Sequence, residues 1–219
     1  MRVTAPIVIV GAGGFGREVL DVIEAVNVLE PTWNFLGFLD DGSPDEELLA
    51  RRRAEHLGPS AGLADIDAHY VIGVGSGEVR ARIDTLAAEV GRRPATLVHP
   101  SATIGSDVEL GEGSIVCAQA SITTHVTLCR HVHIHVACTV GHDAILEDFV
   151  TLLPGVSISG NVTVRQRATV GARAVVLPRL EVGAGAMVGA GAVVVRSVLA
   201  GSTMVGVPAR QVAKERTMT

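Results

Sequence analysis

A six-residue repeat runs through the second half of the chain and decides its fold. Residues 102–197 read, without insertion, ATIGSD VELGEG SIVCAQ ASITTH VTLCRH VHIHVA CTVGHD AILEDF VTLLPG VSISGN VTVRQR ATVGAR AVVLPR LEVGAG AMVGAG AVVVRS. The third residue of every hexad is isoleucine, leucine or valine. This period fits strands, whose side chains alternate between two faces, rather than a helix. We predict short strands with positions one and three inside, two and four outside, and five and six at corners.

The repeat predicts a parallel β-helix with a continuous aliphatic core. With three hexads to a coil, residues separated by three hexads lie above one another, and the repeat makes about five coils. The pattern resembles the left-handed β-helix of hexapeptide-repeat proteins, and that resemblance implies the hand and the three-sided section. Such a prism has two exposed ends. We expect the first half of the chain to cap one end and the C-terminal residues the other.

The first half of the chain reads as a small α/β unit. Its apolar segments predict strands at 7–10, 35–39, 70–75 and 96–98 and helices after residue 16 and at 78–90. Alternating strands and helices are typical of a parallel sheet. We predict three parts, which are an α/β domain (1–98), a β-helix domain (99–197) and a C-terminal cap or tail (198–219).

Composition excludes several classes of protein. Of 219 residues, 47% are apolar and 19% charged, which is typical of a globular chain and not of a disordered one. No apolar run reaches the roughly 20 residues of a membrane-spanning helix, and the net charge of −5 shows no nucleic-acid footprint. The three cysteines, Cys117, Cys129 and Cys138, form no C-x-x-C pair. We therefore expect a cytoplasmic protein that binds neither membranes nor nucleic acid.

The loop Gly11-Ala12-Gly13-Gly14-Phe15-Gly16 follows the first strand and precedes a helix. Glycines let the backbone approach a phosphate, and the helix N-terminus favours an anion. Asp40 stands about where an acid that binds ribose is expected. The first half is too short for a full dinucleotide fold, so we predict a mononucleotide-sized ligand. A tight turn without any ligand is the alternative.

His142 is the strongest candidate for chemistry. It occupies position five of its hexad, at a corner outside the core, and Asp143 follows it. A neighbouring carboxylate makes an imidazole a better general base. One coil further on, the same position is Gly160, whose free N–H would suit an oxyanion. A plain surface role for His142 is the alternative.

Two further patterns have weaker support. A column of small corner residues would admit a thin, extended ligand such as a pantetheine arm, and it comprises Ala118, Val136, Pro154, Ala172 and Ala190. His131, His133 and His135 share an H-x-H-x-H run, for which metal binding is conceivable. We expect instead that they are outward strand and corner residues, of the kind found at subunit interfaces, and we predict no metal site.

The chain as a whole resembles the bacterial NeuD- and PglD-type acetyltransferases of nucleotide sugars and sialic acid. The motifs that carry the resemblance are Gly11 to Gly16, Phe38-Leu39-Asp40-Asp41, Ile72-Gly73-Val74-Gly75, His99-Pro100-Ser101-Ala102, Gly141-His142-Asp143, Ser159-Gly160-Asn161 and Gly206-Val207-Pro208-Ala209-Arg210.

The resemblance implies direct acetyl transfer from acetyl-CoA to an amino group, less often a hydroxyl, of a nucleotide-linked sugar. It implies that His142 is the general base, that Asp143 raises its basicity and that the Gly160 backbone contacts the thioester. The implied acetyl-CoA contacts also include Thr151, Ala172 and Ala190. The implied nucleotide-sugar contacts are Gly13, Gly14, Phe15, Asp40, Asp41 and Gly75. Phe15 departs from the histidine of many members. The family is trimeric, with active sites between neighbouring subunits and no required metal.

Three alternatives stay open at this point. One is an O-acetyltransferase acting on sialic acid or another free sugar. The second is a γ-class carbonic anhydrase, a zinc enzyme on the same β-helix, although no two histidines here have its five-residue spacing. The third is a non-catalytic sensor or scaffold that binds nucleotide sugars.

Overall fold

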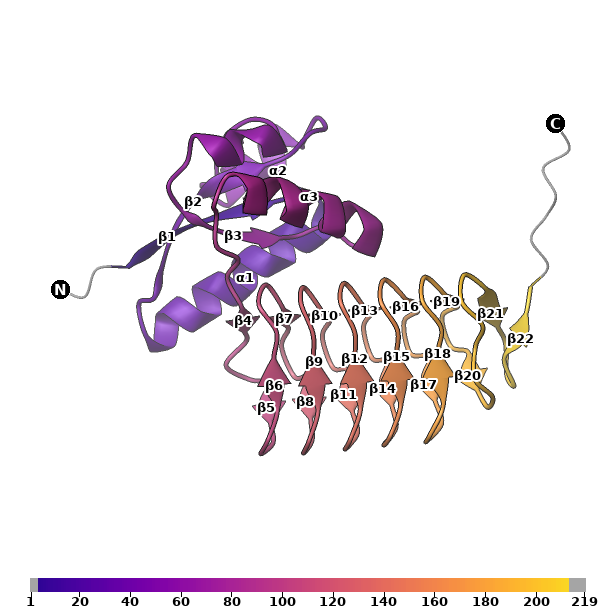
Figure 1. The fold of residues 1–219 in the computed structure, drawn as a ribbon. Coiled ribbons are helices and arrows are strands. Elements are labelled where there is room, and N and C mark those ends of the chain that lie inside the picture. The colour runs from indigo at the N-terminus through magenta and orange to yellow at the C-terminus, as the bar shows by residue number, and fades with distance from the viewer. Residues whose placement is uncertain (1–3, 213–219) are drawn as a thin grey trace, which may run out of the picture.

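A computed structural model describes residues 4–212 and shows an α/β unit followed by a parallel β-solenoid (Figure 1). The α/β unit contains a three-stranded parallel sheet in the order β2-β1-β3. Its elements are β1 (Ala5–Val10), α1 (Gly14–Leu29), β2 (Trp33–Leu39), α2 (Glu46–Arg51), a 3-10 helix (Ser60–Ala64), β3 (His69–Ile72) and α3 (Gly77–Glu89).

The solenoid has three faces, which are named here by their number of strands. The eight-stranded face comprises β4 (Leu97–Val98), β7 (Ile115–Val116), β10 (His133–Ile134), β13 (Thr151–Leu152), β16 (Thr169–Val170), β19 (Met187–Val188), β21 (Thr203–Val205) and β22 (Arg210–Gln211). The six-stranded face comprises β5 (Thr103–Ile104), β8 (Ser121–Ile122), β11 (Thr139–Val140), β14 (Ser157–Ile158), β17 (Val175–Val176) and β20 (Val193–Val194). The five-stranded face comprises β6 (Glu109–Leu110), β9 (Thr127–Leu128), β12 (Ile145–Leu146), β15 (Thr163–Val164) and β18 (Glu181–Val182).

The register predicted from the hexads is confirmed. Positions one and three of the hexads pack inside, as Ala144 and Leu146 do with no exposed surface, and they form one continuous core. Strands three hexads apart pair in parallel, as in the pairing of Ile134 with Leu152. The coils number about six rather than five, because β4 precedes the repeat and β21 follows it.

Position six makes each corner by adopting a left-handed backbone conformation. Among non-glycine residues of the repeat, a positive φ occurs at Asp107, Gln119, His125, His131, Ala137, Asp143, Phe149, Asn161, Arg167, Arg173 and Arg179. None of these residues is β-branched, in keeping with the steric cost of this conformation. Asparagine, aspartate and histidine tolerate it best, so polar groups gather at the corners.

The α/β unit packs against a side of the solenoid rather than capping its end (Figure 1). Val19 and Ile23 of α1 are buried in one cluster with Leu97 and Ile115, whose side chains point outward from the eight-stranded face. At the open end of the prism, Ile104 is only partly buried. The segment expected to be the fourth strand of the α/β sheet is β4, which pairs with β7 of the solenoid instead.

The far end of the solenoid is closed by the chain after the repeat. β21 and β22 form an antiparallel pair, and Ala209 is buried in the solenoid core. Residues 213–219 of the expected cap or tail lie outside the described residues. No helix within residues 4–212 has the length and apolar character needed to cross a membrane.

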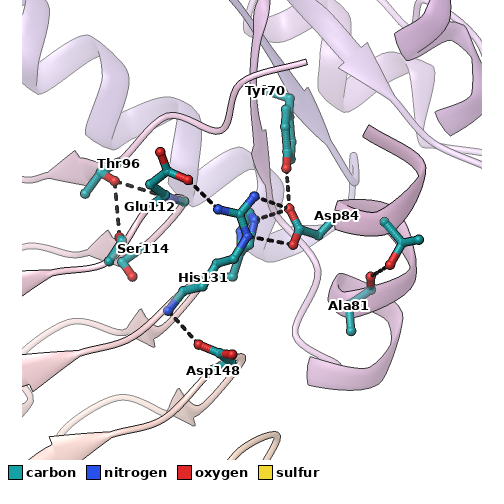
Figure 2. A network of polar contacts seen from close by, with 12 residues as sticks. Tyr70, Ala81, Asp84, Thr96, Glu112, Ser114, His131 and Asp148 are labelled. Carbon is teal, nitrogen blue, oxygen red and sulfur yellow. Dashed lines mark hydrogen bonds and ion pairs between the residues drawn. The ribbon is translucent and has the colours of Figure 1, made fainter. Parts of the chain in front are cut away.

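A polar network fastens α3 to the solenoid (Figure 2). The Asp84 carboxylate accepts hydrogen bonds from Arg130 (Nε–Oδ2 2.7 Å, Nη2–Oδ1 2.7 Å), from Nε2 of His131 (2.8 Å) and from the Tyr70 hydroxyl. Burial alone would raise the pKa of Asp84, but the hydrogen bonds from His131, Arg130 and Tyr70 hold that pKa well below its ordinary value. Asp84 is thus an ionised clamp between the two units.

Arg80 makes a second link across the same junction. Its buried guanidinium donates to the carbonyl oxygens of Val74 and Gly75 on one side and of Phe149 and Val150 on the other. Burial lowers the pKa of Arg80 to about 9. Because four backbone carbonyls replace water around this cation, the junction is specific as well as apolar.

Replacing Asp84 by asparagine should destabilise the fold. At pH 7 we expect the Asp84→Asn variant to lose about 2–4 kcal/mol of unfolding free energy, because it removes the anion that Arg130 and His131 share and leaves Arg130 paired with Glu112 alone. Since the folded-state pKa is depressed, this stabilisation is complete above about pH 4 and declines progressively as the pH falls from there through the folded-state pKa. The difference between variant and wild type should therefore narrow in acid.

Urea denaturation at pH 7 and at pH 3.5 measures both effects. Glu89→Gln, an exposed carboxylate on the same helix, is the matched control and should change stability by less than about 0.5 kcal/mol. Equal stability of Asp84→Asn and wild type at pH 7 would contradict the role of the clamp.

Candidate active site

His142 lies at the edge where the six-stranded and five-stranded faces meet. It sits in the corner between β11 and β12, and 59% of its side chain is exposed. Its Nδ1 is 2.6 Å from Oδ2 of Asp143. An ionised carboxylate only accepts hydrogen bonds, so Nδ1 carries the proton and Nε2 keeps its lone pair. The pair therefore presents a basic nitrogen to ligands.

Gly160 stands directly beneath this imidazole. A Cβ atom built on Gly160 would come within 2.5 Å of Nε2 of His142, so any side chain there would displace the ring. Among the residues that the structure describes, the Gly160 N–H has no hydrogen-bond acceptor. A Cβ atom built on Gly141 would lie 2.6 Å from the backbone nitrogen of Gly160. Two glycines thus leave a base and a free N–H donor side by side.

Two more groups line the same edge, and the sequence argument missed both. His125 Nδ1 lies 3.8 Å from Oδ1 of Asp143, and its Nε2 lies 3.3 Å from Oδ2 of Asp107. Asp107, His125 and Asp143 occupy position six of successive coils. Following position six from coil to coil, as was done for position five, would have identified His125 and Asp107. His142, Asp143 and Gly160, which the sequence predicted, are brought together as expected from their register.

The glycine-rich loop lies on the α/β unit, at the N-terminus of α1. Gly13 is the N-cap residue of α1 and has no side chain to cap the helix. Cβ atoms built on Gly13 or Gly14 would meet nothing within 4 Å. In contrast, a Cβ on Gly16 would come within 1.8 Å of the Gly11 carbonyl oxygen. The third glycine of the motif therefore lets α1 approach the end of β1, while Gly13 and Gly14 leave open space before free N–H groups.

Asp40 and Asp41 are already engaged within the α/β unit. Oδ2 of Asp40 accepts from the Ala12 N–H (2.7 Å) and Oδ1 from the Gly42 N–H (2.8 Å). Asp41 accepts from both the backbone N–H and the hydroxyl of Ser60. Asp40 therefore holds the glycine-rich loop in shape, a role that spacing alone did not predict.

The H-x-H-x-H run points outward from the solenoid, as expected, but it is buried because the α/β unit covers this face. His133 is fully buried, and neither of its ring nitrogens has a hydrogen-bond partner. Phe15 stacks on His135 and tilts against His133, with ring centroids 4.2 and 5.0 Å apart. Burial lowers the pKa of His135 to about 4 and that of His133 well below its ordinary value, so both rings are neutral. Nothing in the described part of the chain is grouped to hold a metal ion.

Thr151 and Gly75 meet at this junction. The Thr151 hydroxyl donates to the Gly75 carbonyl oxygen (3.1 Å), and Thr151 is almost fully buried. Both residues line a groove of about 620 Å³ between the start of α3 and the eight-stranded face, which continues past Thr169 to Met187. The groove is bounded by the two units of one chain.

The predicted residues fall into three separate places in a single chain. His142, Asp143 and Gly160 share the edge between the six- and five-stranded faces. Ala172 and Ala190 lie at another edge, where the eight- and six-stranded faces meet, between β16 and β17 and between β19 and β20. The glycine-rich loop, Asp40, Phe15, Gly75 and Thr151 belong to the α/β unit or to the face that it covers.

Comparisons with known proteins agree with this architecture. A family model described as the PglD N-terminal domain matches residues 6–85. A GDP-perosamine N-acetyltransferase of Escherichia coli O157:H7 is 30% identical over 162 residues, which are 71% of each chain. The chain belongs to the NeuD/PglD-type acetyltransferase family. The resemblance proposed from its motifs is confirmed.

Solved structures give the same result. The acetyltransferase domain of PglB from Neisseria gonorrhoeae is 30% identical, with a TM-score of 0.84, over 95% of this chain and all of that one. PerB from Caulobacter crescentus, solved with CoA and GDP-perosamine, is 28% identical with a TM-score of 0.83, over 95% of this chain and 97% of that one. The expected left-handed β-helix and the expected enzyme class, a sugar acetyltransferase, are therefore confirmed.

A side chain at Gly160 should lower the activity of the site around His142 without unfolding the protein. We expect Gly160→Ala to lower kcat by about tenfold to a hundredfold, because the new methyl group pushes the imidazole away from its aligned position. Gln166→Ala, at an exposed position five on a different edge, should leave kcat unchanged. Steady-state kinetics with thermal melts of both variants provide the test. A fully active Gly160→Ala enzyme would show that the reaction takes place elsewhere.

Proposed function

We propose that this chain transfers the acetyl group of acetyl-CoA to an amino group of a nucleotide-linked sugar, with His142 as the general base. The observation that carries the proposal is the exposed imidazole, oriented by Asp143, beside the unpaired N–H of Gly160. Related proteins are described as GDP-perosamine N-acetyltransferases, and a PglB domain was solved with acetyl coenzyme A. GDP-perosamine is accordingly the first acceptor to test.

The reaction proceeds by direct transfer. The neutral amine of the sugar attacks the thioester carbonyl carbon, a C–N bond forms, and Nε2 of His142 takes the proton that the nitrogen loses. The Gly160 N–H donates to the oxyanion of the tetrahedral intermediate. When this intermediate collapses, the C–S bond breaks, and the proton on His142 passes to the sulfur of the departing CoA. Asp143 keeps the imidazole in the reactive tautomer and stabilises its charged form.

The acceptor binds through its nucleotide to the α/β unit. The open space at Gly13 and Gly14, before the free N–H groups of α1, suits a diphosphate. Asp40 orders this loop and Asp41 orders the adjoining segment. The sugar then extends past Phe15 and Gly75 into the groove beside Thr151. This arrangement keeps the acceptor contacts that the family resemblance implies, with Asp40 acting through the loop.

One chain cannot bring the acceptor to His142, so we propose a homotrimer. The acceptor groove opens on the eight-stranded face, whereas His142 lies on the opposite edge of the prism. A neighbouring subunit that places its His142 edge against this groove completes the site. The CoA arm then lies between subunits and passes Ala172 and Ala190. We further propose that the reaction is cytoplasmic and that domains 1–98, 99–197 and 198–219 divide nucleotide binding, transfer and capping.

Removing the imidazole should abolish transfer but not donor binding. We expect His142→Ala to lower kcat by about 10²–10⁴, the usual contribution of a general base. The affinity for acetyl-CoA, measured by calorimetry, should stay within about twofold. Thiol release from acetyl-CoA with a panel of nucleotide-linked amino sugars provides the assay. A folded His142→Ala variant with wild-type turnover would overturn the proposal.

Mixing two inactive variants should restore activity if the site lies between subunits. Gly13→Glu fits the loop sterically, since Gly13 has an ordinary φ of −68°, but its carboxylate repels a diphosphate. In randomly mixed trimers with His142→Ala, about a quarter of the sites pair an intact loop with an intact imidazole. We therefore expect about a quarter of wild-type activity after the two are refolded together.

The control for this experiment is Gly13→Ala, which adds the same backbone restriction without the charge and should bind acceptor normally. Refolded mixtures that stay inactive, although each variant alone keeps the trimeric mass, would show that each site is formed within a single subunit.

A further inference from the structure

A column of alternating acids and histidines runs along the edge that carries His142. Asp107, His125 and Asp143 occupy position six of successive coils, with φ values of 53°, 54° and 59°. Because their backbones share one conformation at one coil spacing, their side chains project in the same direction. The backbone adds to this alignment, since the N–H of His125 donates to the Ser106 carbonyl and that of Asp143 to the Thr124 carbonyl.

The side chains form a continuous chain of contacts that ends at the proposed base. Asp107 Oδ2 lies 3.3 Å from Nε2 of His125, whose Nδ1 lies 3.8 Å from Oδ1 of Asp143. Oδ2 of Asp143 is 2.6 Å from Nδ1 of His142. The two oxygens of Asp143 therefore face two different imidazoles. This contact is not required by the fold, because other position-six residues make corners without it, as Gln119 and Ala137 do.

We infer that His125, anchored by Asp107, is a positioning residue for acetyl transfer, acting on His142 only through Asp143. The inference rests on the proposed function of His142. Nδ1 of His125 lies at ion-pair distance, 3.8 Å, from the oxygen of Asp143 that His142 does not use, so it favours the carboxylate orientation that keeps the hydrogen bond to His142 aligned.

The test replaces His125 by asparagine, which tolerates the left-handed backbone of this corner. We expect kcat at the pH optimum to fall about threefold to tenfold, while KM for acetyl-CoA stays within about twofold. Gln119→Asn, an exposed position-six residue on another edge with a similar φ of 59°, is the matched control.

A double variant tests whether Asp107 acts through His125. Asp107→Asn alone should lower kcat, but adding it to His125→Asn should cause no further change, since its anchor role is already lost. If the double variant showed additive losses in kcat, Asp107 would act independently of His125. A His125→Asn variant whose kcat matches that of Gln119→Asn, or whose loss appears in KM for acetyl-CoA instead of kcat, would overturn the inference itself.

The two proposals fail in different ways. If wild-type enzyme transfers no acetyl group, or if His142→Ala keeps full turnover, the proposed function is wrong. If His142 is essential and His125→Asn has the kcat and KM of the Gln119→Asn control, only the positioning role of His125 is wrong.

Discussion

Stacking of buried aliphatic side chains in every third hexad sets where each corner side chain of the solenoid lies. Because positions one and three are held in the core, position five and position six of each coil stand above those of the coil before. This register places Gly160 under the imidazole of His142 and aligns Asp143 with His125. The geometry of the edge is therefore set by the core, and a change that shifted the register would displace every group on it.

The second constraint is the junction between the two units. The outward side chains of β4 and β7 are apolar, so α1 covers them, and Asp84 and Arg80 fix α3 over the coils that follow. Because the α/β unit docks on the eight-stranded face, the glycine-rich loop and the groove beside Thr151 lie over that face. The junction thus positions the acceptor site, whereas the register of the repeat positions the base.

Much of this structure was predictable because the decisive signals are local. The hexads specify which side chains point inward, and a strand, a glycine-rich loop and a helix specify one α/β crossover. The corner location of His142 follows from its position in the hexad. Its alignment with Gly160 follows because the two residues are three hexads, or one coil, apart. No ligand or distant contact is needed for either conclusion.

Other features depend on contacts between distant segments. His133 and His135 are buried because the α/β unit docks on the face that carries them, and the spacing of the hexads does not predict this docking. Leu97, Ile115 and Cys117 are apolar at outward positions and carry a signal that this face is covered. Spacing likewise predicted Asp40 near a ribose, whereas the role of its carboxylate in ordering the loop through the Ala12 N–H could not be predicted from spacing. His125 was missed because the position-six column was not followed from coil to coil.

A crystal structure of the enzyme with CoA and a nucleotide-linked amino sugar tests the central claim most directly. The account predicts the sugar amine within about 3 Å of Nε2 of His142 and the CoA sulfur beside the Gly160 N–H, with the nucleotide held by a neighbouring subunit. A complex in which the amine and the sulfur meet away from the His142 edge would contradict it.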